Sequence, residues 1–117
     1  MKFFTLSEFD SPDAKGSGQN MDPVFLQQLD RARDLAGCPF VVNSGYRTKS
    51  ANQKAGGVLD SAHLSGLACD IATPDSNTRH RVLYGLISAG FNRLGIGENY
   101  IHVDRDKSKA PNVAWLY

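Results

Sequence analysis

Two stretches of the chain repeat apolar residues at the three- and four-residue spacing of a helix that buries one face. The first begins at Asp22-Pro23, where aspartate can cap a helix and proline suits its first turn. The second follows the turn Thr73-Pro74-Asp75-Ser76 and stops before Gly90, the expected C-cap. The patterns predict helices at about 23–36 and 77–89.

Shorter runs of apolar or alternating residues predict four strands, at 40–43, 67–72, 91–96 and 100–104. The last two are expected to form a hairpin around the turn at 97–99. A short helix is expected at 48–55 and a loop at 58–65. The first 20 residues are predicted to be extended, and the apolar end of the tail at 105–117 to pack back onto the domain. This mixture favours one α+β domain over 1–117, with a small, mostly antiparallel sheet packed with helices.

Composition and charge argue against several classes of partner. With 41% hydrophobic and 21% charged residues, the chain has the make-up of an ordinary globular domain. The net charge of +1 and the lack of a basic run interleaved with aromatics argue against nucleic acid. No apolar stretch is long enough to insert into a membrane, and Met1 to Leu6 is too short for a secretory signal. We therefore expect a monomer made in the cytoplasm without a signal peptide, and Cys38 and Cys69 as buried thiols.

The stretch from Ser61 to Asp70 contains a histidine and, seven residues later, a carboxylate. In a strand, Gly66, Ala68 and Asp70 would share one face, and their small side chains would leave room for another group to approach. The opposite face, with Cys69 and Ile71, would belong to the core. His63 and Asp70 are therefore candidate ligands of a divalent metal.

A third ligand is suggested by the alternation from Tyr100 to Asp104, in which Ile101 and Val103 would be buried. His102 would then share the other face with Tyr100 and Asp104. Two histidines and one carboxylate leave a fourth position open on a tetrahedral ion, which is typical of catalytic rather than structural zinc.

Taken singly, each of these residues has a simpler interpretation. A lone histidine is more often a hydrogen-bonded or surface residue than a metal ligand. Asp104 could pair with Arg105 at the end of its strand, and Arg47 could be a solvated loop charge. His80 has no partner pattern and is interpreted as a surface residue. The metal hypothesis depends on the combination of His63, Asp70 and His102.

The pattern Ser61-x-His63-x-x-Gly66-x-Ala68-x-Asp70 with the later His102 resembles the zinc D-alanyl-D-alanine carboxypeptidases, peptidase family M15, and within it subfamily A. Further matches lie upstream and downstream, so the resemblance runs from about residue 22 to 104: Ser44-Gly45-Tyr46-Arg47-Thr48, Asn52, Gly56-Gly57, Gly95-Ile96-Gly97 and His102-Val103-Asp104. It implies a hedgehog-like α+β fold, a catalytic zinc ion, and cleavage of peptide bonds in peptidoglycan stem peptides by a carboxypeptidase or an endopeptidase, of phage or bacterial origin. Such an enzyme would reach the cell wall by export or by phage-mediated release.

By analogy with the family, Arg47 would meet a carboxylate or the developing oxyanion of the substrate, and Ser61 and Tyr100 are further candidates for substrate binding. The chain departs from many relatives at Asn99, because they carry an acidic general base three residues before the last histidine ligand. The candidate bases are therefore Asp104 first and Glu98 second; Asp104 could instead orient a ligand.

Two other functions fit parts of the pattern. His102-x-Asp104 with a distant histidine imitates the facial triad of a non-haem iron oxygenase, but that reading gives Asp70 no role. A non-catalytic, metal-stabilised module that binds peptidoglycan would explain the missing acid at Asn99.

Overall fold

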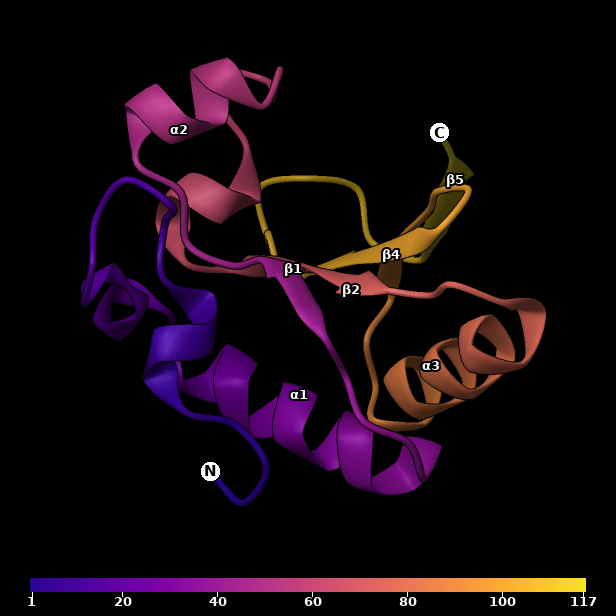
Figure 1. Ribbon diagram of the computed structural model, residues 1–117. Coiled ribbons are helices and arrows are strands. Elements are labelled where there is room, and N and C mark those ends of the chain that lie inside the picture. Colours follow the sequence, from indigo (N-terminus) through magenta and orange to yellow (C-terminus); the bar gives the residue numbers. More distant parts are fainter.

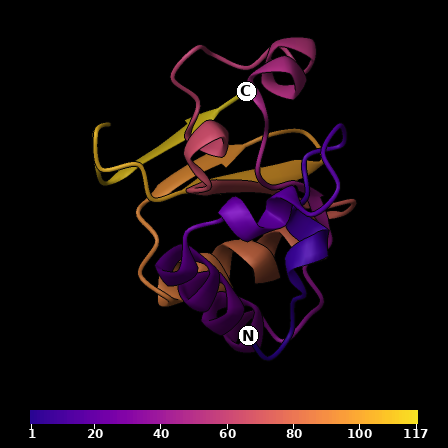
Figure 2. The same cartoon turned by 90° about the vertical axis from the view of Figure 1, so that its left-hand side faces the viewer.

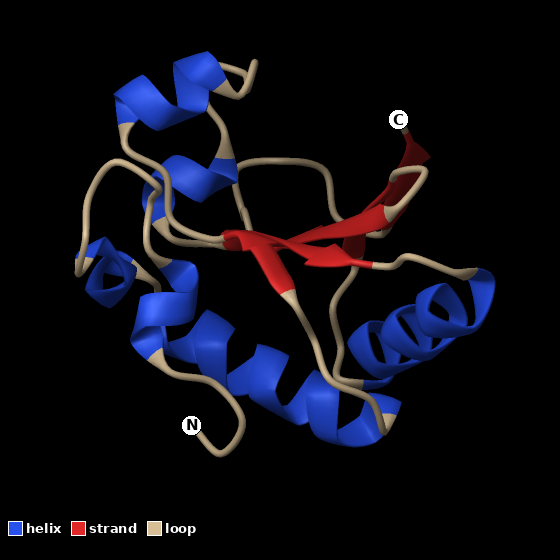
Figure 3. Ribbon diagram, in the orientation of Figure 1, coloured by secondary structure: helices blue, strands red, loops and turns tan.

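A five-stranded sheet runs through the centre of the molecule, with the strand order β1-β2-β4-β3-β5 (Figures 1 and 3). The computed structural model describes residues 1–117. The strands are β1 (Val42–Ser44), β2 (Ala68–Ala72), β4 (Tyr100–Asp104), β3 (Arg93–Ile96) and β5 (Val113–Leu116). All neighbours pair antiparallel except β3 and β5, which are parallel. The predicted α+β fold with a small, mostly antiparallel sheet is therefore confirmed.

Two helices, α1 (Pro23–Ala36) and α3 (Ser76–Ser88), pack against each other on one side of the sheet (Figure 1). The short helix α2 (Lys49–Lys54) lies on the opposite side, and Figure 2 shows the same division from another direction. Asp22 caps α1 by accepting from the Phe25 backbone N–H, and Asp75 caps α3 through Thr78. These caps explain why both helices begin where the sequence predicts.

The core fills the space between the sheet and the α1–α3 pair. Alternate residues of β2 and β4 point into it, including Ile71, Ile101 and Val103, which are fully buried. The helices contribute Phe25, Leu29, Val82 and Leu86. Because one face of the central strands belongs to the core, the other face is left for polar side chains.

Several predicted boundaries shift in the structure. The first strand is Val42–Ser44 rather than 40–43, and β3 begins at Arg93 instead of residue 91. The loop expected at 58–65 contains a 3-10 helix, η3 (Ala62–Ser65), which carries His63. Ala89 is the C-cap of α3, with Gly90 following at a φ of +95°.

Both ends of the chain are more ordered than the pattern predicts. Residues 1–20 contain two 3-10 helices, η1 (Leu6–Phe9) and η2 (Ser17–Asn20), and they bury Phe4 and Phe9 in the core. The tail returns to the domain, as expected, but does so as the strand β5 at the edge of the sheet. No helix has the length and apolar character needed to span a membrane.

Candidate metal centre

Three potential ligands meet on the polar face of the central strands. Asp70 on β2 and His102 on β4 are directly paired across the two strands. His63 comes from η3, the turn that leads into β2, where the Ser61 hydroxyl accepts from the His63 backbone N–H. The strand register and the turn together bring these three side chains to one place.

The donor atoms of the three residues converge. Asp70 Oδ1 lies 3.0 Å from His102 Nδ1 and 3.4 Å from His63 Nε2. One potential ligand atom from each residue lies within 4.8 Å of the others. A divalent cation could therefore be bound by both histidines and the carboxylate with modest movement of the side chains.

The other ring nitrogen of each histidine already has a hydrogen-bond partner. His63 Nδ1 is 2.7 Å from the Gly45 carbonyl oxygen, and His102 Nε2 is 2.7 Å from Asp104 Oδ2. When these nitrogens carry the proton and donate, His63 Nε2 and His102 Nδ1 remain free to bind a metal. This is the arrangement that fixes the tautomer and ring orientation of metal-binding histidines, so the residues fit the ion that the sequence predicts.

The two histidines beside Asp70 stabilise the ionised form of its carboxyl group. Burial alone would raise the pKa of Asp70, but hydrogen bonds with His102 and His63 outweigh it and hold the pKa well below its usual value. Burial opposes the charged form of His102, yet the Asp104 and Asp70 carboxylates raise its pKa. Asp70 is therefore ionised at neutral pH and available as a ligand.

Arg47 borders the same cluster from the segment after β1. Its guanidinium reaches Asp70 Oδ2 at 3.2 Å, and further hydrogen bonds to Ser44 Oγ and Asn52 Oδ1 fix its position. The side chain is 15% exposed, so it is held in place while part of it faces the cleft. Arg47 is thus placed beside the cluster and is not the freely solvated loop charge of the simpler interpretation.

A cleft of about 490 Å³ opens over the three candidate ligands. Arg47, Ser61 and Tyr100, the predicted substrate-binding residues, all line it. The cleft also contains Trp115 and Tyr117, which the sequence analysis did not single out. Their contribution depends on the pairing of β5 with β3, which no local pattern in the tail indicates.

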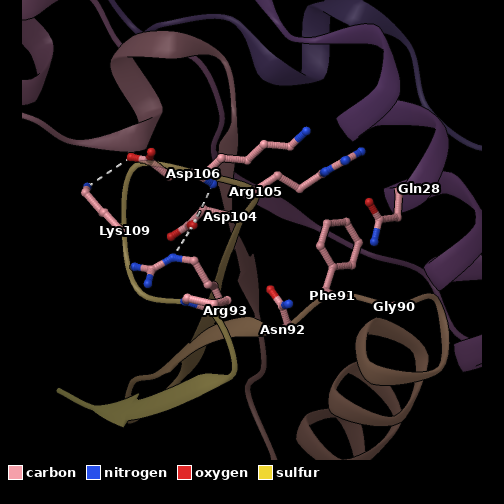
Figure 4. A pocket seen from close by; sticks show the side chains of 11 residues that line it. Gln28, Gly90, Phe91, Asn92, Arg93, Asp104, Arg105, Asp106 and Lys109 are labelled. Carbon is pink, nitrogen blue, oxygen red and sulfur yellow. Dashed lines mark hydrogen bonds and ion pairs between the residues drawn. The ribbon is translucent and has the colours of Figure 1, made fainter.

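Asp104, the first candidate for the general base, does not line this cleft. Its side chain is 2% exposed and is held by His102 Nε2, by Arg93 Nε at 2.7 Å and by the Asp106 backbone N–H. Figure 4 shows Asp104 and Arg93 beside a separate polar cavity of about 290 Å³. The geometry suits the alternative role considered for Asp104, in which it orients His102.

Glu98 and Asn99 also lie outside the lining of the cleft. Both are exposed in the turn between β3 and β4, where the Glu98 carbonyl oxygen accepts from Arg79. Asp70 is the only Asp or Glu residue that lines the cleft. The structure does not bring either candidate base to the site.

The small residues near Asp70 have a different role from the one expected. Gly66 lies outside β2 and caps η3 with a φ of +71°. A Cβ atom at this position would lie 2.2 Å from the Asn20 carbonyl oxygen, and Ala68 is fully buried. The chain's own N-terminal segment, rather than an approaching ligand, occupies the space beside Gly66.

A protein-family model described as Peptidase M15 matches residues 4–104. The chain belongs to peptidase family M15. The match includes all three candidate ligands together with Arg47 and Asp104, and membership supports a hydrolase that cleaves peptide bonds. The M15 match ends before β5, so Trp115 and Tyr117 lie outside it. No curated protein matches the chain.

Proposed function

We propose that this M15 peptidase is zinc-dependent and cleaves peptide bonds in the stem peptides of bacterial peptidoglycan. The observation that supports zinc most directly is the convergence of His63 Nε2, His102 Nδ1 and the Asp70 carboxylate, with the other ring nitrogens already bonded. The peptidoglycan substrate is inferred from the resemblance of the Ser61–Asp70 pattern to the zinc D-alanyl-D-alanine carboxypeptidases. In this proposal the enzyme acts at the cell wall after export or phage-mediated release.

Held by these three side chains, zinc would supply Lewis acidity toward the scissile carbonyl group. The residues of the chain then have separate tasks. Asp104 holds His102 through Nε2, and the Gly45 carbonyl holds His63 through Nδ1. Arg47 lies beside Asp70 and can donate hydrogen bonds to a substrate carboxylate or to the developing oxyanion.

Elemental analysis combined with mass spectrometry of digested peptidoglycan tests this proposal. The purified chain should contain about one zinc per molecule, and His63→Ala should lose most of it because one of three protein ligands is gone. The wild-type protein should release stem-peptide fragments. Arg47→Ala should keep most of its zinc, because all three candidate ligands remain, yet lose turnover by about 100-fold, because the donor to the substrate carboxylate or oxyanion is gone.

Full zinc retention in His63→Ala would contradict the ligand assignment. Unchanged turnover in Arg47→Ala would show that the arginine serves the fold alone.

A second candidate function is a metal-stabilised module that binds peptidoglycan without cutting it. The observation in its favour is that no Asp or Glu side chain other than the candidate ligand Asp70 lines the cleft, so neither candidate base faces a substrate there. The same experiment separates the two functions. Binding of zinc-loaded protein to peptidoglycan with no product released would support the module and contradict the peptidase.

A further inference from the structure

We propose that β5 supplies one wall of the substrate site, where Trp115 and Tyr117, together with Tyr100, bind an uncharged aliphatic surface of the substrate. This inference rests on the proposed function and deepens it. Two parts of peptidoglycan present such a surface of C–H groups: the alanine methyls of the stem peptide and the sugar rings of the glycan.

The pairing of β5 with β3 brings both aromatic residues to the cleft. Val113 donates to the Asn92 carbonyl oxygen and Tyr117 to that of Ile96, which places Trp115 opposite Gly95. Side chains alternate along a strand, so Trp115 and Tyr117 share one face. Both line the cleft, whereas Leu116 between them does not and is 79% exposed.

The rings of this wall lie close to one another and to the ring of the candidate ligand His102. The Trp115 ring lies 5.7 Å from that of His102, and the Tyr117 ring lies 5.3 Å from that of Tyr100, between ring centroids. The Arg93 guanidinium, which also holds Asp104, lies 5.0 Å from the Trp115 ring. Arg93 therefore contacts both this wall and the carboxylate that holds the candidate ligand His102.

Gly95 leaves room for the rings. A Cβ atom at this position would lie 2.7 Å from Trp115 Nε1 and 2.6 Å from Tyr117 Cε2. Any side chain on this face of β3 would therefore push both aromatic residues out of their present position.

Packing alone does not account for these rings. Neither Trp115 nor Tyr117 belongs to the hydrophobic core, and Tyr117 is 66% exposed at the edge of the cleft. Partly exposed, uncharged aromatic rings beside the three candidate metal ligands form a surface suited to apolar groups of a substrate.

The cationic side chain that is available to a substrate lies on the side of the cleft opposite this aromatic wall. Arg47 follows β1, and β1 and β5 are the two opposite edges of the sheet. Lys109 also lines the cleft, but Asp106 and the Asp60 carbonyl oxygen bind its ammonium group. A substrate that places its carboxylate or carbonyl at Arg47 would thus extend its uncharged part toward β5.

The chain has a single tryptophan, so the fluorescence of Trp115 reports directly on this wall. We would titrate the zinc-loaded full chain with a free tetrapeptide stem and with the same peptide attached to its disaccharide. Trp115→Ala, which removes the fluorophore, would be measured by calorimetry. Tyr117→Ala, Trp115→Ala and Gly95→Ala should each weaken binding about tenfold, the scale of an aromatic contact in a binding site. Leu116→Ala on the same strand is the matched control and should stay within about twofold.

Zinc content is measured for every variant, so that loss of substrate binding can be distinguished from loss of the metal ion. Weakened binding of both ligands supports contact with the peptide methyls, and weakened binding of the glycan-linked ligand alone supports contact with the sugar. Unchanged binding in all three variants overturns the inference, as does loss of zinc in all three, which would make the wall a support for His102. If the wild-type chain binds neither ligand, the proposed function fails and this inference with it.

Discussion

At the scale of single residues, the two ring nitrogens of His102 have separate tasks. Nδ1 faces Asp70, and Nε2 faces an Asp104 carboxylate that Arg93 also binds. Burial raises the pKa of Asp104, but its hydrogen bonds with His102, the Asp106 backbone and Arg93 lower it below the usual value. A carboxylate held in this way is suited to fixing an imidazole and poorly suited to taking a proton from the cleft.

Asp104→Asn and Glu98→Gln should therefore behave differently. The asparagine variant should lose about 10- to 100-fold in zinc affinity, because an amide is a weaker acceptor for His102 Nε2. The glutamine variant should keep both zinc affinity and turnover, because Glu98 is exposed outside the cleft. Competition with a zinc chelator and turnover at saturating zinc measure the two effects.

The opposite results would identify one of these two residues as the general base. Normal zinc affinity with a loss of about 100-fold in turnover in Asp104→Asn would make Asp104 the base. The same loss in Glu98→Gln would show that the turn brings Glu98 into the site during catalysis.

The sequence could indicate the three candidate ligands because their signals are local. A seven-residue interval separates His63 from Asp70, and alternation places His102 on the polar face of its strand. Arg93 could not be found in this way, because its pairing with Asp104 depends on how β3 and β4 align. In the simpler interpretation Asp104 would pair with Arg105; in the structure the carboxylate binds Arg93 on the neighbouring strand.

At the scale of elements, the helices were the most predictable part. Asp22 and Asp75 mark helix starts by accepting backbone hydrogen bonds, and each acts where the pattern places it. The first helix ends at Ala36, as predicted, because Gly37 after it has a left-handed backbone. β5 was not predictable as a strand, because its partner β3 lies about 20 residues earlier and its side chains lack a buried alternating face. Parallel pairing is decided by the fold as a whole.

The contact between α1 and α3 depends on Gly85. A Cβ atom at this position would lie 2.3 Å from the Ala32 carbonyl oxygen and 2.7 Å from Ala36 Cβ. Gly85→Ala should lower the free energy of unfolding by about 1–3 kcal/mol through overpacking, despite the better helix propensity of alanine. Denaturant unfolding measures the change. Ser88→Ala, exposed in the last turn of α3, is the control and should change it by less than about 0.5 kcal/mol.

If Gly85→Ala instead raised the free energy of unfolding, α1 and α3 would be able to move apart without a loss of stability.

At the scale of the whole molecule, the N-terminal segment supports the candidate metal centre from a distance. Phe9 is fully buried, and its carbonyl oxygen accepts from the Tyr46 backbone N–H. The neighbouring Gly45 carbonyl is the partner of His63 Nδ1, and Arg47 N donates to the His63 carbonyl oxygen. The segment at 1–20 has no helix or strand periodicity, which is why the sequence predicted only an extended stretch there.

Phe9→Ala should therefore affect both stability and metal binding. Loss of a fully buried aromatic ring should lower the free energy of unfolding by about 3–5 kcal/mol. Zinc affinity should fall as well, because the segment that holds His63 loses its support. Leu6→Ala in the same 3-10 helix is 45% exposed before substitution and should change neither. A Phe9→Ala protein that is destabilised yet binds zinc normally would show that the candidate metal centre does not depend on the packing of the N-terminal segment.

The direct pairing of Asp70 with His102 has a consequence for how the chain folds. About 30 residues, including α3 and β3, separate the two central strands, so their alignment must be found among alternatives during folding. A slip by one residue would turn His102 or Asp70 toward the core and separate the two donors. The proposed zinc ion would bind with both ligands only in the aligned state, and its binding free energy would add to the stability of that state alone. The ion proposed for catalysis would in this way also select the correct strand alignment in a newly made chain.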